Sequence, residues 1–182
     1  LIANGYATGV DIKINGEFVK NTESWMSFSL MKTEENIKED YYEDNTEVGY
    51  IPRPTDQRFK LNIFFQDYIP QKENYKMHLN LVYGSGLPFG PPKGERYQDI
   101  LRIPSYRRVD IGFSVNLKSK QLSKAKWLNI FDKIWFSAEV FNLLDINNTI
   151  SYIWISDITG RQYAVPNYMT SRQLNGKLIL NF

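Results

Sequence analysis

The sequence predicts an all-β protein, and more specifically a transmembrane antiparallel β-barrel with long extracellular loops and short periplasmic turns. Three observations favour this fold class. Apolar and polar residues alternate with period two through seven segments, which is typical of strands with one apolar and one polar face. All eight prolines lie outside these segments, as expected for strands that need their ladder donors. Short and long connections alternate, so every long loop falls at the same end.

The clearest strand pattern is VDIGFSVNLK at 109–118, where Val109, Ile111 and Phe113 alternate with Asp110 and Ser114. The same alternation recurs in shorter form along the chain. The expected strands are 6–18, 25–32, 59–68, 77–83, 109–118, 134–140 and 174–182. A helix-like pattern occurs at 121–133, and the long loop 146–167 contains a hairpin-like pair of segments around Ile158, Thr159 and Gly160.

The composition excludes several function classes. The net charge of +2 gives no basic field for nucleic acid. The chain has no cysteine and a single histidine, His78, so a disulfide framework, a thiolate metal site and any site with two imidazoles are excluded. No run of about 18 apolar residues is present, which excludes a spanning helix but not spanning strands. The mean hydropathy of −0.42 is compatible with alternating strands.

Strand directions indicate that the chain is part of something larger. If the last strand runs towards the periplasm, counting back through seven strands places the start of the first strand outside the cell. Single-chain bacterial barrels have an even number of strands, and their N-terminus has no ordinary route outside. We therefore expect residues 1–182 to be the C-terminal segment of a larger outer-membrane barrel. The alternative is a complete eight-stranded barrel in which one strand has been missed.

Several motifs resemble the TonB-dependent outer-membrane receptors, especially the Bacteroidetes type, and they occur in that family's order. The motifs are IPRPTDQRF (51–59), VYGSGLPFGPP (82–92), YRRVDIGFS (106–114), AEVFNLLDINN (138–148) and GRQYAVPNYMTSRQLNGKLILNF (160–182). The resemblance implies that the chain supplies the last seven strands of a 22-stranded barrel in the outer membrane of a Gram-negative bacterium. It also implies that the family's plug domain is not part of these residues. Leu178, Leu180 and Phe182 resemble the C-terminal signal that the outer-membrane assembly machinery reads.

The resemblance further implies a function and a set of partners. Such receptors take up a scarce nutrient, which can be a siderophore, cobalamin, an oligosaccharide or a peptide. Uptake is energised by TonB, ExbB and ExbD through the plug. The implied partners are this machinery, the outer-membrane lipids, the assembly machinery and, in one branch of the family, a surface lipoprotein.

Two other classes stay open at this point: a small complete outer-membrane barrel with an adhesive or structural role, and a soluble carbohydrate-binding β-sandwich. An enzyme is not expected, because acid pairs such as Glu34 and Glu35 lie in loops without an apolar pocket that would raise a pKa. No cofactor is expected either. The carboxylate-rich stretch 34–47 matches no EF-hand register and is expected to be a solvated loop rather than a metal site.

Ligand recognition is expected in the extracellular loops 34–55, 85–105 and 146–167. Aromatic side chains there are the candidate ligand contacts: Tyr41, Tyr42, Phe89, Tyr97, Tyr152, Trp154 and Tyr163. For the last three, packing within the hairpin is the alternative. Aromatic residues near strand ends predict an interfacial girdle. They are Trp25, Phe65, Tyr68, Tyr75, Tyr83, Trp127, Trp135 and Tyr168.

The polar sides of the strands are expected to line the lumen. The candidate lumen residues are Asp11, Lys13, Lys60, Asn62, His78, Asn80, Asp110, Ser114, Asn116 and Glu139. Charges on such a wall are costly unless they are paired or wet. Two cross-lumen ion pairs are therefore possible, Asp110 with Arg107 or Arg108 and Glu139 with Lys60 or Lys118. His78 is expected to be a hydrogen-bonded wall residue.

Overall fold

The computed structural model describes residues 3–20, 22–37, 47–69, 72–92, 94–97, 100–118 and 131–181. These residues form strands joined by turns and loops, so the prediction of an all-β antiparallel architecture is confirmed. Among them there is no helix of the length and hydropathy that crossing a membrane requires. Most of the helix-like pattern at 121–133 lies outside the described residues.

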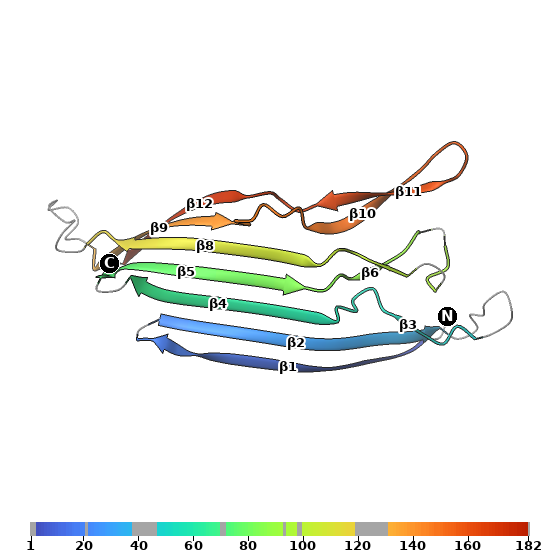
Figure 1. The fold of residues 1–182 in the computed structure, drawn as a ribbon, viewed down its shortest axis with the longest axis horizontal. Helices are drawn as coiled ribbons and strands as arrows, with labels where there is room; N and C mark the ends of the chain where they lie inside the picture. The colour runs from blue at the N-terminus through green and yellow to red at the C-terminus, as the bar shows by residue number, and fades with distance from the viewer. Residues whose placement is uncertain are drawn as a thin grey trace.

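Seven long strands form one antiparallel sheet in the order β1-β2-β4-β5-β8-β9-β12 (Figure 1). Their bounds are β1 (Ala3–Val19), β2 (Thr22–Ile37), β4 (Phe59–Ile69), β5 (Lys72–Gly84), β8 (Tyr106–Asn116), β9 (Lys133–Phe141) and β12 (Gln173–Asn181). Each of the seven predicted strands corresponds to one of these. The short strand β3 (Tyr50–Pro52) pairs with the far end of β2. The first two strands are longer than predicted, because β1 and β2 stay paired from Ala3 opposite Ile37 almost to their turn.

Two small hairpins lie beyond one end of this sheet (Figure 1). One joins β6 (Pro88–Phe89) to β7 (Leu101–Arg102), and the other joins β10 (Thr149–Ser156) to β11 (Gln162–Tyr168). The second is the hairpin predicted in loop 146–167. Its turn uses Gly160 at a φ of 83°, a left-handed conformation that costs glycine little. We call this end of the sheet, with β3 and both hairpins, the loop end.

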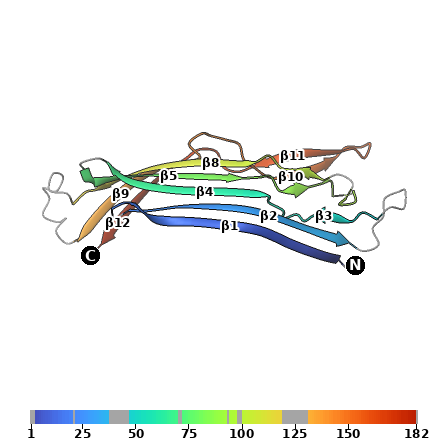
Figure 2. The same ribbon diagram turned by 60° about the horizontal axis from the view of Figure 1, so that its bottom comes forward.

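The connections alternate in length as predicted. The long connections, which carry β3, the β6–β7 hairpin and the β10–β11 hairpin, all reach the loop end (Figures 1 and 2). The ends at which β1 is followed by β2, and β4 by β5, after two residues lie at the opposite end, which we call the turn end. Strands β1 and β12 both run from the loop end to the turn end, because an even number of antiparallel steps separates them.

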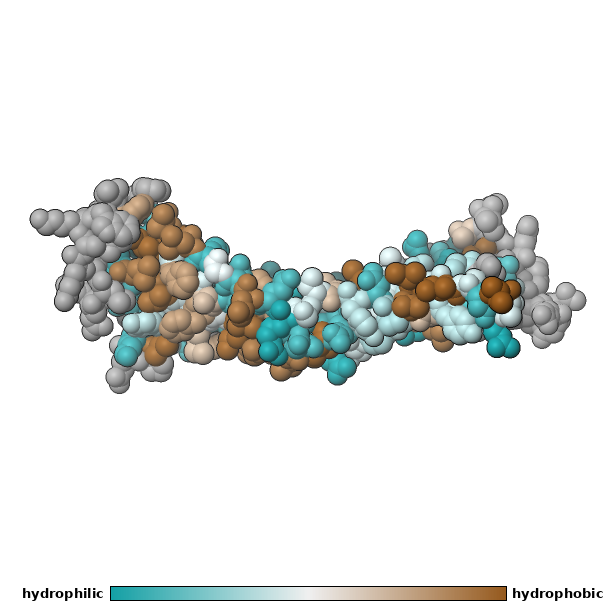
Figure 3. Space-filling model, turned by 90° about the horizontal axis from the view of Figure 1, so that it is seen from above, coloured by the Kyte–Doolittle hydropathy of each residue, from teal (hydrophilic) through white to brown (hydrophobic). Residues whose placement is uncertain are grey.

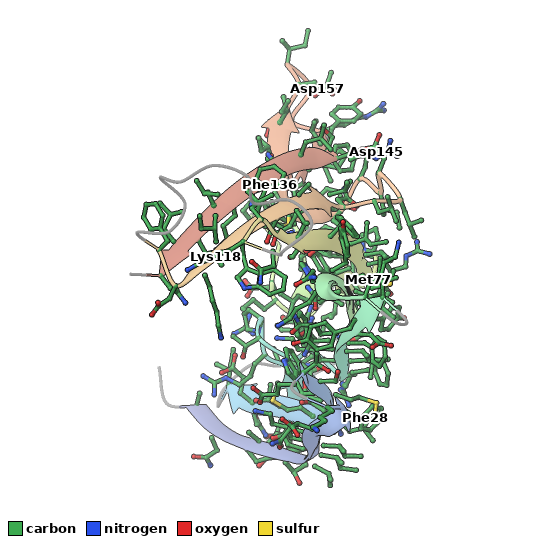
Figure 4. The ribbon with its side chains drawn as sticks, turned by 90° about the vertical axis from the view of Figure 1, so that its left-hand side faces the viewer. Phe28, Met77, Lys118, Phe136, Asp145 and Asp157 are labelled. Carbon is green, nitrogen blue, oxygen red and sulfur yellow. The ribbon has the colours of Figure 1, made fainter. Side chains whose placement is uncertain are left out.

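The sheet is open and bent into an arc. In the described residues β1 pairs only with β2 and β12 pairs only with β9, so each has a free edge. Viewed along the strands, Phe28 and Met77 lie on the outer side of the arc (Figure 4). The buried residues are mostly polar: Asp56 is 0% exposed and Asp110 5%, whereas Ile51 and Ile134 are the buried apolar residues of the described chain. The sheet therefore lacks the apolar core of a soluble domain.

Candidate functional site

The register divides the sheet into two chemically different faces. Residues directly opposite each other in an antiparallel pair point to the same side. Asp11 lies opposite Ser29, which in turn lies opposite Lys60, and polar residues remain aligned in this way across the sheet. All the candidate lumen residues fall on this side, which we call the polar face. They are Asp11, Lys13, Lys60, Asn62, His78, Asn80, Asp110, Ser114, Asn116 and Glu139.

Asp110 is the most highly connected carboxylate of the polar face. It accepts hydrogen bonds from Arg108 Nε at 2.6 Å, from the backbone N–H of Asn142 at 2.9 Å and from Asn80 Nδ2 at 3.2 Å. Arg108 is thus its ion-pair partner. Arg107, the other predicted partner, is aligned with Tyr83 on the opposite face. From the middle of β8, Asp110 thus links β5 to the residue that follows β9.

The predicted partners of Glu139 are wrong. Its carboxylate accepts a hydrogen bond from Asn175 Nδ2 at 2.8 Å and lies 3.8 Å from His78 Nε2. Lys118 instead donates to the carbonyl of Phe131. The His78 ring lies over Gly112, where an added Cβ would come within 2.1 Å of its Cε1 atom. Glycine at 112 therefore lets His78 lie along the wall beside Glu139, as a polar wall residue.

Some aromatic residues predicted for the girdle belong to the polar face. Tyr68 and Trp135 flank the ammonium group of Lys76, whose Nζ lies 4.8 Å and 4.9 Å from the two ring centroids. Trp25 stacks on Phe64 at 6.1 Å, also on this face. The girdle prediction is wrong for these residues because strand ends were counted without regard to parity. Trp127 lies outside the described residues.

The opposite side, the apolar face, consists of aliphatic and aromatic side chains. On β5 it runs Tyr75, Met77, Leu79, Leu81, Tyr83, with an aromatic residue at each end. From Tyr75 to Tyr83 the stretch is nine residues long, which is within the range of about 9–11 residues with which a tilted strand crosses a bilayer. The face is uncovered: Met77 is 45% exposed and Phe113 41%. Seen from the β12 side, hydrophobic residues gather over the turn end, where β9 and β12 lie (Figure 3).

At the loop end, Asp56 is fully buried and holds three segments together. Its carboxylate accepts hydrogen bonds from the Thr33 backbone N–H at 2.8 Å, from Arg58 Nε at 2.6 Å and from Arg102 Nη2 at 2.5 Å. Arg102 Nη1 also donates to the carbonyls of Asp56 and Gly86. This network fastens β2, the β3–β4 loop and the β6–β7 hairpin to one another.

The same contacts keep Asp56 ionised. Burial alone raises the pKa of this carboxyl, but the Thr33 N–H and the guanidinium groups of Arg102 and Arg58 outweigh it. Together they hold the pKa of Asp56 below its ordinary value. The sequence pattern missed Asp56, although it lies within the motif at 51–59, because alternation does not reveal that a loop carboxylate will be buried.

The motif at 138–148 folds into a compact turn that seats the β10–β11 hairpin. Asn142 and Asp145 are the described non-glycine residues with positive φ, at 52° and 53°. The Asn148 side chain accepts from the Arg107 N–H and donates to the Arg107 carbonyl, both at 2.8 Å, as a neighbouring strand would. Asp145 in turn accepts a hydrogen bond from the Arg172 N–H at 2.8 Å. The sequence showed the motif but not these roles.

The structure brings some of the candidate ligand contacts together. Phe89 stacks on Tyr152 with ring centroids 4.4 Å apart and lies 6.3 Å from Trp154. Tyr163 is opposite Ile155 on the other side of the hairpin and donates to Asp157. Tyr97 is half-buried in the segment 94–97, and Tyr41 and Tyr42 lie outside the described residues. Thus Phe89, Tyr152 and Trp154 pack on one another across two hairpins.

A cavity of about 320 Å³ adjoins this stack at the loop end. Proline rings and Phe89 line it together with two charged residues, Glu95 and Arg96; the prolines include Pro52, Pro88, Pro91 and Pro92. Arg96 is paired there with Glu35. This cavity thus combines apolar rings with charged groups, and small-molecule sites commonly combine the two.

We expect Phe89→Ala to loosen the β10–β11 hairpin, because the stack is its contact with the β6–β7 hairpin. Hydrogen exchange of β10 and β11 should become about 5-fold faster, the effect of an aromatic pair worth about 1 kcal/mol. Tyr163→Ala removes a comparable ring from the other side of the hairpin and should leave the exchange rates of the β6–β7 hairpin unchanged. If both substitutions loosen the two hairpins equally, the stack is not what couples them.

Comparison with known proteins gives no family assignment. No family model matches the chain, and no match was found among curated proteins or solved structures. The class that the fold itself defines is an open antiparallel β-sheet with one polar face, one uncovered apolar face and its long loops at one end.

Proposed function

We propose that this chain forms part of the barrel wall of a TonB-dependent outer-membrane receptor, which imports a siderophore, cobalamin, an oligosaccharide or a peptide. The observation that carries the proposal is the uncovered apolar face. It extends over all seven long strands and has a strand length suited to an outer membrane. The proposal that the barrel is a TonB-dependent receptor rests on the resemblance of the motifs to that family.

The uncovered face favours a membrane protein over a soluble β-sandwich. A sandwich buries the apolar side of each sheet against a second sheet about 10 Å away. In the described residues nothing covers this side, and large apolar residues such as Leu178 and Val10 are 57% and 59% exposed. Lipid is a solvent in which such a face is stable.

Strand direction favours a large barrel over a complete eight-stranded one. Because β1 and β12 run in the same direction, they would form a parallel pair if the sheet closed on itself. Closure with antiparallel pairs alone requires an odd number of further strands. An eight-stranded barrel would need one more long strand, which the described residues do not contain, whereas a 22-stranded barrel would take its further strands from outside this chain. Strand β3 does not supply the missing strand, because it covers only three residues at the end of β2.

In this proposal each face has a role. The apolar face contacts lipid, the polar face contacts the plug domain or the water-filled lumen, and the loop end contacts the ligand outside the cell. The plug would connect the receptor to TonB, ExbB and ExbD, and a surface lipoprotein is a further candidate partner at the loop end. Assembly of the barrel would use the outer-membrane assembly machinery.

Extraction tests the proposal. The protein in its full natural length, expressed in its host, should fractionate with outer membranes and require detergent for solubility. It should also migrate faster on a denaturing gel before heating than after, as folded barrels do. A protein that is soluble in buffer without detergent would contradict the membrane proposal and favour the carbohydrate-binding sandwich. A folded species formed by residues 1–182 alone in detergent would favour the small complete barrel.

A further inference from the structure

Basic residues lie at the loop-end border of the apolar face. Lys32 follows Leu30 by two residues on β2 and therefore points to the same side. Arg107 is aligned with Tyr83, the aromatic end of that face on β5. The Arg58 guanidinium also reaches this side, because its Nη2 atom donates to Glu34, which lies opposite Tyr6. We call Lys32, Arg58 and Arg107 the basic rim.

The basic rim has more positive than negative charge. Two carboxylates adjoin it. Asp56 is paired with Arg58 Nε at 2.6 Å, and Glu34 accepts contacts from Tyr6 Oη at 2.5 Å, Lys32 Nζ at 2.8 Å and Arg58 Nη2 at 3.2 Å. Arg107 is exposed and has no ion pair with any of the described residues. Lys32 and Arg58 retain side-chain exposures of 42% and 38%. Their charges thus remain accessible from outside the sheet.

The turn end of the same face has more carboxylates than cations. Asp67 is aligned with Met77, and Asp132 precedes Ile134 by two residues, so both carboxylates follow the apolar residues on that side. The turn end also carries one cation, Lys72, whose Nζ lies 6.0 Å from the ring centroid of Tyr75. The apolar face is therefore bordered by a surplus of cations at the loop end and by a surplus of carboxylates at the turn end. Rise along a strand places Lys32 and Arg107 about 7 Å beyond Leu30 and Val109, the depth at which lipid headgroups adjoin the hydrocarbon.

We propose that the basic rim binds the phosphate groups of anionic lipids in the leaflet at the loop end. This rests on the proposed membrane function, since it requires the apolar face to be in lipid. Charge complementarity favours an anionic headgroup as the ligand, because the rim offers a surplus of ammonium and guanidinium groups at headgroup depth. Arginine and lysine are the usual partners of phosphate oxygens. The carboxylates at the turn end make the opposite leaflet a poorer match for anionic lipid.

The test compares two double substitutions that remove the same charge from opposite faces. In the full-length protein, K32Q with R107Q removes two rim cations and keeps Arg58, which Asp56 needs. K13Q with K60Q removes two cations from the polar face. Each purified protein is mixed with phosphatidylglycerol or with a phosphate-free galactosyl diacylglycerol, and the bound lipid is counted by native mass spectrometry.

Phosphatidylglycerol retention should fall about 5-fold for each rim cation removed, the effect expected of one basic residue at an anionic surface. Galactolipid retention should not change, and K13Q with K60Q should bind both lipids as the unsubstituted protein does. Equal losses in the two double variants, or no loss in the rim variant, would overturn the proposal without affecting the proposed receptor function. A protein that retains neither lipid and needs no detergent would contradict the receptor function itself.

A second measurement does not depend on the variants folding. In the unsubstituted protein, phosphatidylglycerol retention should decrease as salt rises from 0.05 to about 0.5 M, because salt screens accessible charges. Galactolipid retention should stay constant over the same range. Phosphatidylglycerol binding that is independent of salt would overturn the rim as a phosphate site.

Discussion

Replacing Phe113 with arginine is expected to destabilise the protein in a lipid bilayer by about 2–4 kcal/mol, the cost of a cation near the midplane on the lipid side of a barrel. Phe113 lies midway along β8 on the apolar face, opposite Met77 on one side and Ala138 on the other. Its ring is 41% exposed, so the substitution creates no overpacking that would itself account for the loss. The change in the free energy of unfolding would be measured by urea titration of the full-length protein under conditions in which it folds reversibly into liposomes.

The matched control is Ser114→Arg, one residue further along the same strand. Ser114 belongs to the polar face, where its hydroxyl lies 2.8 Å from that of Ser137. Arginine there should cost about 1 kcal/mol or less, because that side is expected to be wet. Leu79→Arg and Asn80→Arg form a second pair on β5, with the same expected contrast. Equal losses at the two faces would mean that lipid does not cover the apolar face.

Replacing Asp56 with alanine is expected to destabilise the packing of the loops at the loop end while the sheet stays folded. The substitution leaves the buried Thr33 N–H without an acceptor and separates Arg58 and Arg102 from their shared carboxylate. Each loss of this kind costs about 1–3 kcal/mol, and the arginines recover part of it because both are partly exposed. Hydrogen exchange should accelerate in 50–58 and 85–103 and stay slow in β4 and β5. Asp11→Asn, a carboxylate exposed on the polar face, should alter neither region.

Acid should destabilise the same loops in the unsubstituted protein. The folded-state pKa of Asp56 is lowered, so its contacts stabilise the loop end fully above the unfolded pKa of about 3.9. This contribution is lost as the pH falls through the lower folded-state value. Exchange corrected for its intrinsic rate should therefore rise in 50–58 below about pH 4. In the Asp56→Ala protein the same acid step should be absent, and an unchanged step would assign it to another group.

Much of the fold could be predicted because strand patterning is local. In β8 the alternation of Val109, Ile111 and Phe113 with polar residues fixes both the strand and its two faces without reference to any partner. The same holds for the candidate lumen residues, all of which share one face in the observed register. The alternation also places Tyr68 and Trp135 on the polar face. They were assigned to the girdle only because they lie near strand ends, without regard to the face on which they lie.

The candidate site was less predictable, because its contacts join residues far apart in the chain. The pairing of Asp110 with Arg108 is an exception, because the two residues lie two positions apart on β8 and alternation alone places Arg107 on the other face. Nothing in the stretch around Asp56 indicates that Arg102, from another connection, will share its carboxylate. The same is true of Phe89 and Tyr152, which meet only when two hairpins lie side by side.

The sequence by itself determined the seven long strands, their order of directions and their two chemical faces, because period two and turn residues act over a few neighbouring positions. The tertiary structure decided the pairing register, the buried position of Asp56, the turn at Asn142–Asn148 and the meeting of the basic residues at one rim. These depend on hydrogen bonds and burial between segments that are distant along the chain. Such interactions exist only once the strands are aligned, which is why a residue pattern does not contain them.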